Sequence, residues 1–223
     1  MNLTLFDLDG TLLPTDSDHA FGDFVISLGW ADAAEHKRRN DQFFADYQAG
    51  HLDMTAYVDF ASAPWRDRSA HELDTAMGRF LHEVMQPQLH PAAVALVRRH
   101  QAAGDLVAIV TATNDFVTRP IAGLFGVEVL IATDLARDAQ GRATGLIQGV
   151  PAFQEGKIER VAAWLATRGE TLKSFERSTF YSDSINDLPL LECVSHPVAT
   201  NPGPSLALIA QERGWPVLKL FHS

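Results

Sequence analysis

The chain has 223 residues, a formal net charge of −10 at pH 7 and a hydrophobic fraction of 46%. This length allows one large domain or a core with a smaller insert, and the ordinary composition excludes an intrinsically disordered chain. The acidic charge argues against nonspecific binding to nucleic acid or to an anionic membrane. Cys193 is the one cysteine, which excludes an intrachain disulfide, and we expect it to be a small core residue.

The sequence has no membrane or export signal. No stretch approaches the roughly 18 consecutive apolar residues of a transmembrane helix. No basic segment followed by an apolar run precedes the first predicted strand. We therefore expect a cytoplasmic protein, a monomer or a homodimer, whose partner is a small molecule rather than nucleic acid or a membrane.

Two aspartates follow the first apolar run of the chain. Residues 3–6 are expected to form a buried strand, and Asp7 and Asp9 come directly after it in the segment Asp-Leu-Asp-Gly-Thr. Two carboxylates at the end of a buried strand are costly unless a cation pairs with them or they are used in chemistry. The alternative is a solvated turn with an Asx cap.

The following segment, residues 16–87, has helical periodicity and little strand character. Aromatic and aliphatic residues recur there at three- and four-residue spacings in four successive stripes. Asp53 and Ser69 are suitable N-caps, and Gly29 and Gly50 lie where helices are expected to end. We expect about four helices that form a small bundle inserted after the first strand.

From residue 88 onwards, helical segments alternate with apolar strands, which predicts an α/β fold with a doubly wound parallel sheet. Strands are expected at 106–110, 127–131, 179–182, 194–199 and 216–218, and helices at 92–103, 115–124, 155–168, 186–192 and 205–211. The turn signal at 138–142 predicts a hairpin between two short strands. We assign residues 1–15 and 88–223 to the core and residues 16–87 to a helical cap. The cap would lie over the carboxyl ends of the strands, where such sheets bind ligands.

Three further segments carry polar residues where strands end or helices begin. They are Thr111 and Ala112 after the second main strand, Lys157 near the start of a helix, and the acidic segment 183–187. Two acidic loops at neighbouring strand ends suggest a hard cation held by oxygen ligands. A threonine and a lysine beside them suggest an anion held against that cation, and a phosphate meets both demands. Each residue alone could be structural, as a helix cap for example.

Taken together, these residues resemble the haloacid-dehalogenase superfamily of phosphatases. Its four short motifs are present in order: Asp7-x-Asp9-Gly10-Thr11, Thr111 at a strand end, Lys157, and Asp183-x-x-Asn186-Asp187. The helical insert is similar to the C1 cap of that superfamily. The chain looks like a member of subfamily IB, which includes phosphoserine phosphatases.

The resemblance implies roles for the acidic motifs. Asp7 would attack phosphorus and form an aspartyl-phosphate, and Asp9 would protonate the leaving group and then activate water. Mg²⁺ would be held by Asp7, Asp183 and the backbone carbonyl of Asp9. Asn186 and Asp187 would lie just outside this ligand set and orient it.

The resemblance also implies a phosphate site and a reaction type. Thr111, Ala112 and Lys157 would hold the phosphoryl oxygens. Dehalogenases of the superfamily lack the second aspartate of the first motif, so Asp9 points to phosphoryl transfer.

The substrate is expected to be recognised by the cap. Segments 17–19 and 40–50 resemble a branch of subfamily IB that includes bacterial histidinol-phosphate phosphatases. A cationic amino alcohol with an imidazole would suit acidic and aromatic cap side chains. The candidate substrate-binding residues are Asp16, Asp18, His19, Phe43 and Asp46. We expect histidinol phosphate first, which implies a role in amino-acid biosynthesis, then phosphoserine, then a broad set of small phosphorylated metabolites.

Two other classes of function stay open at this point. A phosphotransferase would use the same residues to move the phosphoryl group to a second metabolite. A non-catalytic scaffold that binds phosphate would be signalled by loss of Asp7, Asp9 or Asp183, and all three are present.

Overall fold

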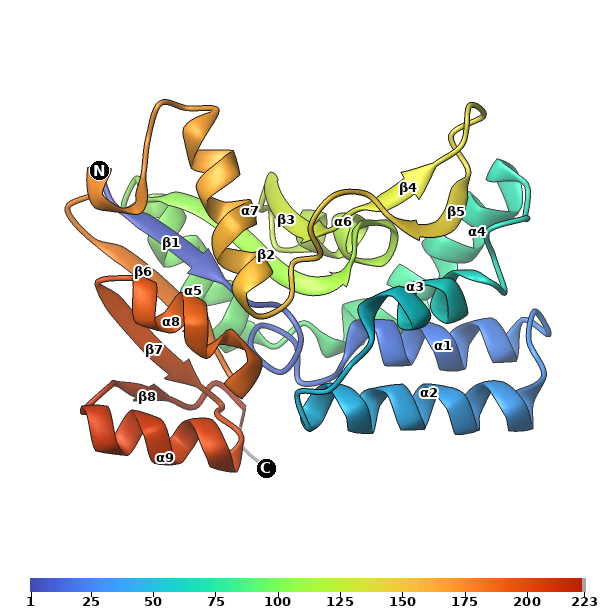
Figure 1. The fold of residues 1–223 in the computed structure, drawn as a ribbon, viewed down its shortest axis with the longest axis horizontal. Helices are drawn as coiled ribbons and strands as arrows, with labels where there is room; N and C mark the ends of the chain where they lie inside the picture. Colours follow the sequence, from blue (N-terminus) through green and yellow to red (C-terminus); the bar gives the residue numbers. More distant parts are fainter. Residues whose placement is uncertain (222–223) are drawn as a thin grey trace.

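The computed structural model describes residues 1–221, which form a six-stranded, fully parallel sheet and a separate two-stranded hairpin (Figure 1). The order in the large sheet is β3-β2-β1-β6-β7-β8, so β1, which ends at the aspartate pair, lies in the interior of the sheet. The strands are β1 (Leu3–Phe6), β2 (Leu106–Asn114), β3 (Val129–Thr133), β6 (Ser178–Ser182), β7 (His196–Thr200) and β8 (Val217–Leu218).

Helices cover both faces of this sheet, which confirms the predicted doubly wound α/β fold. The helices are α5 (Pro91–Ala102) and α6 (Asp115–Leu124) on one face, and α7 (Glu155–Ala166), α8 (Leu188–Cys193) and α9 (Pro204–Arg213) on the other. Leu5 and Phe6 of β1 belong to the buried clusters on opposite faces. A strand covered on both faces reads as a continuous apolar run because neither face meets water.

The segment between β1 and α5 is helical, as its periodicity predicts. Its helices are α1 (Ser17–Ser27), α2 (Ala33–Gln48), α3 (Met54–Ser62) and α4 (Ala70–Arg79), followed by a π-helical turn (Phe80–Met85) and a 3-10 turn (Gln86–Gln88). Asp53 caps α3, and Ser69 forms a capping box with Glu72 at the start of α4. Gly29 and Gly50 adopt the positive φ expected of residues that end helices.

The cap shares its hydrophobic core with the sheet. Phe21 and Phe24 of α1 belong to the same buried cluster as Phe6 of β1 and Ile109 of β2. Helix α1 also contacts α6 and β2. On this side the helical insert therefore joins the core through an apolar interface, and the division at residues 16–87 stays a prediction.

A short antiparallel hairpin extends from the sheet toward the cap (Figure 1). Its strands are β4 (Leu135–Arg137) and β5 (Ala143–Ile147), and its turn has the predicted sequence. Asp138 accepts hydrogen bonds from the backbone amides of Gln140 and Arg142, which stabilises the turn. Strand β5 packs against α3. The hairpin thus supports the cap at a second point.

Two expectations differ from the structure. Cys193 is exposed, because the six-residue helix α8 buries Leu190 and Leu191 and leaves its last residue outside that stripe. Strand β2 continues beyond the expected end at residue 110 to Asn114, with an irregular register against β3 over the added residues. Among residues 1–221 no helix has the length and apolar character needed to cross a membrane.

Candidate active site

The loop after β1 places Asp7 against a buried lysine from α7. The Lys157 Nζ atom lies 2.8 Å from Asp7 Oδ1 and 2.6 Å from Asp187 Oδ1. All three side chains are buried. Burial alone would lower the pKa of Lys157. The charges of Asp187 and Asp7 outweigh this effect, so the pKa lies above its ordinary value. Burial raises the pKa of Asp187 to about 6 against the opposing charge of Lys157. The lysine is therefore held charged between two carboxyl groups.

Asp183 follows β6 and meets Asp7 through the side chain of Thr11. The Thr11 hydroxyl lies 3.2 Å from Asp7 Oδ2 and 3.0 Å from Asp183 Oδ1, and it accepts a hydrogen bond from the Asp183 amide. A single hydroxyl proton cannot satisfy both carboxylates. Burial, followed by the charges of Asp7 and Asp187, raises the pKa of Asp183 well above its ordinary value. Burial likewise raises the pKa of Asp7, while Lys157 opposes the rise.

This excess of negative charge fits a divalent cation. Asp7 and Asp187 are buried beside Lys157, and the half-buried Asp183 lies next to Asp7 on the far side of Thr11. At Gly10 an added Cβ would lie 2.2 Å from Asp183 Oδ2, so glycine leaves this space open. Within residues 1–221, no three His, Cys, Asp or Glu side chains converge as a ready ligand set. A cation here would combine two carboxylates with backbone oxygen and water, as Mg²⁺ commonly does.

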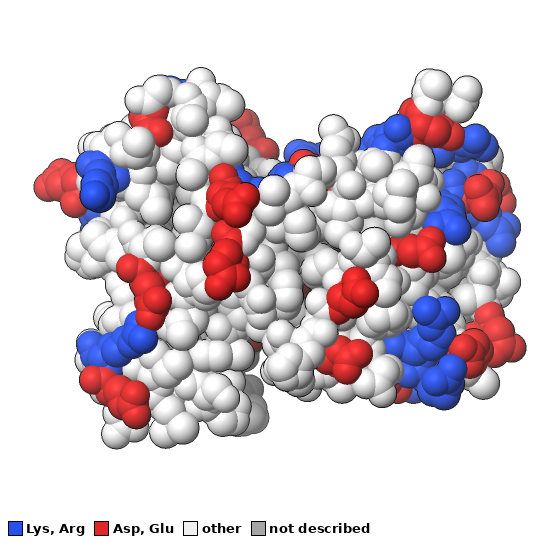
Figure 2. Space-filling model, in the orientation of Figure 1, with Lys and Arg blue, Asp and Glu red and all other residues white. Residues whose placement is uncertain are grey.

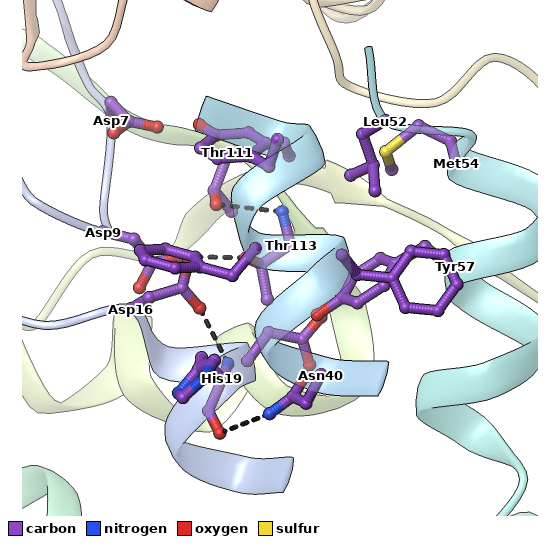
Figure 3. A pocket seen from close by; sticks show the side chains of 15 residues that line it. Asp7, Asp9, Asp16, His19, Asn40, Leu52, Met54, Tyr57, Thr111 and Thr113 are labelled. Carbon is purple, nitrogen blue, oxygen red and sulfur yellow. Dashed lines mark hydrogen bonds between the residues drawn. The ribbon is translucent and has the colours of Figure 1, made fainter. Parts of the chain in front are cut away.

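Asp9 lies on the side of the loop that faces the cap. Its Oδ1 atom accepts a hydrogen bond of 2.8 Å from the Ser17 amide, and its Oδ2 atom accepts one of 2.9 Å from the Thr113 hydroxyl (Figure 3). Burial and the charge of Asp16 raise the pKa of Asp9 to about 7. A carboxyl group with this pKa can give and take a proton near neutral pH.

The end of β2 contributes the neighbouring wall. Thr111 and Ala112 line the same cavity as Asp7 and Asp9, since β2 pairs with β1. The Thr111 side-chain oxygen accepts a hydrogen bond of 3.2 Å from the Thr113 amide (Figure 3). Thr113 was not among the predicted site residues. Because Thr111 and Thr113 are two residues apart on one strand, both can face the same side of it, and the Thr-Ala-Thr sequence could have indicated Thr113 as well.

The cavity continues from this centre into the cap (Figure 3). Its cap side is lined by Asp16, Asp18, His19, Asn40, Phe43, Phe44, Tyr47, Leu52, Met54 and Tyr57. No lysine or arginine is among the described residues that line it. The cap therefore presents carboxylates, one histidine and aromatic rings to a bound molecule.

Two carboxylates of this cap region lie at the start of α1, where Asp18 is buried and Asp16 is half-buried. Asp16 caps α1 by accepting a hydrogen bond of 2.7 Å from the His19 amide. Asp18 accepts hydrogen bonds of 2.8 Å from the Tyr57 hydroxyl and 3.1 Å from the Asn114 amide group. Burial is the main cause that raises the pKa of each carboxyl to about 6. Both are anionic at neutral pH, with neutral groups as their hydrogen-bond donors.

Four of the five predicted cap residues line this cavity. Asp46 is not among the described residues that line it, and its carboxylate accepts a hydrogen bond from Gln42 on the outer side of α2. The cavity-facing side of α2 carries Phe43 and Tyr47, and Asp46 lies roughly 100° around the helix from that side. Tyr47 and Tyr57 also line the cavity, although their helical spacing predicts only that they face the interior of the cap.

Asn186 contacts the cap, and its expected role beside the metal ligands stays a prediction. Its amide group donates a hydrogen bond of 2.8 Å to the Tyr47 carbonyl oxygen, so it joins the acidic loop after β6 to the cap. Asp187 is oriented instead by the Ser182 hydroxyl, which donates to its Oδ2 atom at 2.7 Å. Within this motif, Asp187 therefore pairs with Lys157, whereas Asn186 contacts the cap.

A wider cleft of about 620 Å³ leads from the same centre to solvent. Asp9, Phe44 and Tyr47 line both the cleft and the cavity, while Ile185 and Pro204 form part of the outer wall of the cleft. Figure 2 shows a notch on the lower edge of this view, where α2 and α9 face each other. A substrate can therefore reach the aspartates between the cap and the core.

Comparison with known proteins agrees with this geometry. Residues 4–192 match the family model of haloacid dehalogenase-like hydrolases. A histidinol-phosphatase of Neisseria meningitidis serogroup C (strain 8013) is 47% identical over 217 residues, which cover 97% of this chain and 98% of that protein. A solved structure of a protein of unknown function from Bordetella pertussis Tohama I is 51% identical, with a TM-score of 0.93 over 99% of both chains. The structure of a phospho-aspartyl intermediate analogue of phosphoserine phosphatase shares the fold, with a TM-score of 0.68 and 16% identity over 99% of this chain and 94% of that chain.

The chain belongs to the haloacid dehalogenase-like hydrolase family, which confirms the resemblance seen in its motifs. Within that family it is a phosphatase. Asp9, the residue that distinguishes phosphoryl transfer from dehalogenation in the resemblance, is half-buried and hydrogen-bonded close to Asp7.

Proposed function

We propose that the protein is a Mg²⁺-dependent phosphomonoesterase that acts through an aspartyl-phosphate on a small metabolite with a cationic leaving group, with histidinol phosphate the best candidate. One observation carries the proposal. Asp7, held between Lys157 and Thr11, lies at one end of a cavity whose cap end is lined by the carboxylates of Asp16 and Asp18 and by aromatic rings. The residues proposed to react with phosphate and those proposed to bind a cationic group therefore line the same cavity.

In the first step Asp7 is the nucleophile. Lys157 holds its Oδ1 atom at 2.8 Å and orients the carboxylate. A carboxylate oxygen forms a bond to phosphorus while the bond from phosphorus to the leaving oxygen breaks. Asp9, protonated at this stage, transfers its proton to that leaving oxygen. Lys157 and Thr111 would offset the charge that develops on the phosphoryl oxygens.

In the second step water attacks phosphorus and releases Asp7. Asp9 is now a carboxylate and takes the proton of the attacking water, so phosphate leaves and both aspartates return to their starting states. The hydrogen bonds from Ser17 and Thr113 hold Asp9 in place for both steps. Mg²⁺, bound by Asp7, Asp183 and the Asp9 carbonyl, would supply positive charge to the phosphoryl group.

The charge of the cap cavity favours a cationic substrate. Asp18 is a buried carboxylate and Asp16 a half-buried one, and a cation in the leaving group would compensate their charge. The rings of Phe43, Phe44 and Tyr47 offer faces that attract imidazole and ammonium groups. Phosphoserine would bring its own carboxylate into a space where no described lining residue is a lysine or arginine. The name of the Neisseria relative supports the same choice.

The alternatives keep a lower rank. Phosphoserine or a broad set of small phosphorylated metabolites would use the same reaction centre, and a phosphotransferase would replace water by an alcohol. A non-catalytic scaffold would not require Asp7 and Asp9 together, with Lys157 buried against Asp7. The cytoplasmic location, a role in amino-acid biosynthesis and a monomeric or dimeric state stay predictions.

A substrate panel tests the proposed function. Purified protein with Mg²⁺ is assayed for phosphate release from histidinol phosphate, phosphoserine and p-nitrophenyl phosphate, with and without an added alcohol acceptor. We expect kcat/KM for histidinol phosphate to exceed that for phosphoserine by about tenfold or more, equivalent to roughly 1.4 kcal/mol. Phosphorylated acceptor among the products would indicate a phosphotransferase, and absence of phosphate release from all three would reject the proposal.

The nucleophile is tested by Asp7→Asn. The amide is a poor nucleophile toward phosphorus, so turnover should fall by about 10³-fold or more. Asp46→Asn makes the same chemical change outside the cavity and should leave kcat and KM unchanged. Retention of near wild-type turnover by Asp7→Asn would contradict the mechanism.

A further inference from the structure

Gln154 has a backbone conformation that its own residue type disfavours. It directly precedes α7 with φ 50° and ψ −124°, a region that residues with a Cβ rarely occupy. Its side chain makes no capping hydrogen bond to α7 in the described structure, although Ser, Thr, Asn and Asp at this position usually do. Local preferences therefore favour a glycine or a capping residue here, and the helix gives no reason for glutamine.

The side chain of Gln154 instead reaches the cap. Its Nε2 atom lies 3.3 Å from the Gly50 carbonyl oxygen and 3.4 Å from Asn186 Oδ1. Asn186 in turn donates a hydrogen bond to the Tyr47 carbonyl oxygen. Tyr47 lies in the last turn of α2 and Gly50 directly follows its C-cap, so both carbonyl groups mark the C-terminal end of this helix. Two side-chain amides of the core thus hold the end of one cap helix.

The contact is close and is supported by an aromatic pair. A Cβ added at Gly50 would lie 3.3 Å from Asn186 Oδ1, so the cap backbone approaches the core here without a side chain between them. The ring centroids of Phe153 and Tyr47 are 5.9 Å apart. Tyr47 lines both the cavity and the cleft. The position of this end of α2 therefore shapes the space around the reacting aspartates.

Gln154 also connects this contact to the catalytic lysine. Its carbonyl oxygen accepts a hydrogen bond from the Lys157 amide in the first turn of α7. The segment that places Lys157 beside Asp7 is thus the same segment that presents an amide to the cap. Unfavourable backbone conformations that persist in a fold commonly mark functional positions.

We propose that Gln154 is a positioning residue that, together with Asn186, fixes the end of α2 and thereby Tyr47 over the reaction centre. The strained backbone of Gln154 is retained because glycine would relieve the strain but lose the amide. Gln154 touches no reacting atom. The choice of substrate in the test rests on the proposed function.

Two variants separate the backbone from the side chain. Gln154→Gly relieves the backbone and removes the amide, so Tm should rise by about 2–4 °C while kcat/KM for histidinol phosphate falls by about 10- to 100-fold. Gln154→Glu keeps the size of the side chain but replaces the donor amide group by a carboxylate oxygen, which cannot donate to the Gly50 carbonyl or to Asn186 Oδ1. We expect the same loss of kcat/KM. Gln148→Glu adds the same charge at an exposed position nearby and should match the wild type.

Hydrogen–deuterium exchange gives a readout that does not depend on any substrate. Amides of residues 45–51 should exchange faster in Gln154→Gly than in the wild type, while those of β1 and β2 should be unchanged. If the wild type fails to hydrolyse histidinol phosphate, the substrate assignment fails and p-nitrophenyl phosphate replaces it, with exchange still testing the contact. Unchanged exchange in Gln154→Gly would overturn the inference, as would equal kcat/KM for Gln154→Glu and Gln148→Glu.

Discussion

Asp18 shows at the scale of one residue how a site can oppose stability. Its carboxylate is buried and accepts hydrogen bonds only from neutral donors, among the described residues, on Tyr57 and Asn114. Burial raises the pKa of Asp18 from 3.8 to about 6. Between these two pH values the folded protein binds more protons than the unfolded chain, so stability falls as the pH rises through that window. Such a carboxylate is better explained by a cationic ligand than by folding.

Replacement of Asp18 by Asn should remove this pH-dependent penalty. The amide oxygen of asparagine can accept from both the Tyr57 hydroxyl and the Asn114 amide group, as Asp18 Oδ2 does here, so both donors keep an acceptor. Above pH 6 the variant should be more stable than the wild type by on the order of 3 kcal/mol, and the difference should vanish as the pH falls below 3.8. Urea unfolding at several pH values measures this difference.

The same variant should bind the proposed substrate less well. Loss of the carboxylate should raise KM for histidinol phosphate with a smaller effect on kcat, because Asp18 lies in the cap part of the cavity. A variant that is less stable than the wild type at pH 8 would contradict the assigned sign of the burial effect.

At the scale of elements, the turn after β1 decides whether the strand ends meet. Gly10 has φ 73°, and an added Cβ would lie 2.2 Å from Asp183 Oδ2. Gly29, which follows α1, has φ 70° with no atom of residues 1–221 within 4 Å of such a Cβ. Both glycines therefore adopt a positive φ that disfavours a Cβ, but only at Gly10 would the Cβ also meet a neighbouring side chain.

Gly10→Ala and Gly29→Ala form a matched pair. Each should destabilise the protein by about 1–2 kcal/mol, because alanine is unfavourable at positive φ. Only Gly10→Ala should displace Asp183, and it should lower kcat by about 100-fold or more. Thermal unfolding and phosphatase assays of both variants check this, and equal activities would show that Gly10 serves the turn alone.

At the scale of the whole molecule, the cap and the sheet share one apolar cluster. Phe21 and Phe80 of the cap segment are buried in the same cluster as Phe6 and Ile109 of the sheet. Because neither part can lose this interface without exposing apolar surface, we expect a single unfolding transition. Calorimetry should give equal calorimetric and van't Hoff enthalpies, whereas a separate transition of the cap at lower temperature would contradict this expectation.

Charge is distributed unevenly over the molecule, which has a formal net charge of −10. Lys and Arg side chains gather at the cap end of the face in Figure 2, where ion pairs such as Arg66–Asp59 and Arg38–Glu35 neutralise them. The reaction centre keeps an excess of carboxylates around Lys157. A bound divalent cation should therefore stabilise the folded state.

Mg²⁺ should raise Tm and chelation should remove activity. At a concentration of 100 times Kd, binding to the folded state alone contributes about 2.7 kcal/mol. Asp183→Asn should lose this thermal shift, because it removes one of the two proposed carboxylate ligands. An activity that survives exhaustive chelation, or a Tm that does not respond to Mg²⁺, would contradict the proposed metal site.

The sequence by itself determined the features that depend on near neighbours and on periodicity. The cap helices, the apolar strands and the acidic pair of Asp7 and Asp9 follow from patterns a few residues long. The resemblance of four short motifs added Lys157 and Asp183 because parallel strands bring their carboxyl ends to one edge of a sheet. These residues could be predicted as part of the site without knowing the directions of their side chains.

Which side chains contact one another could be seen only in the tertiary structure. Asp18 meets Asn114, which is 96 residues away, and Lys157 meets Asp187 across 30 residues. Asp46 and Cys193 turned out to lie outside the surroundings expected for them. The physical reason is that burial depends on what packs against each side of a helix, and short α8 and the outer side of α2 leave these residues facing outward.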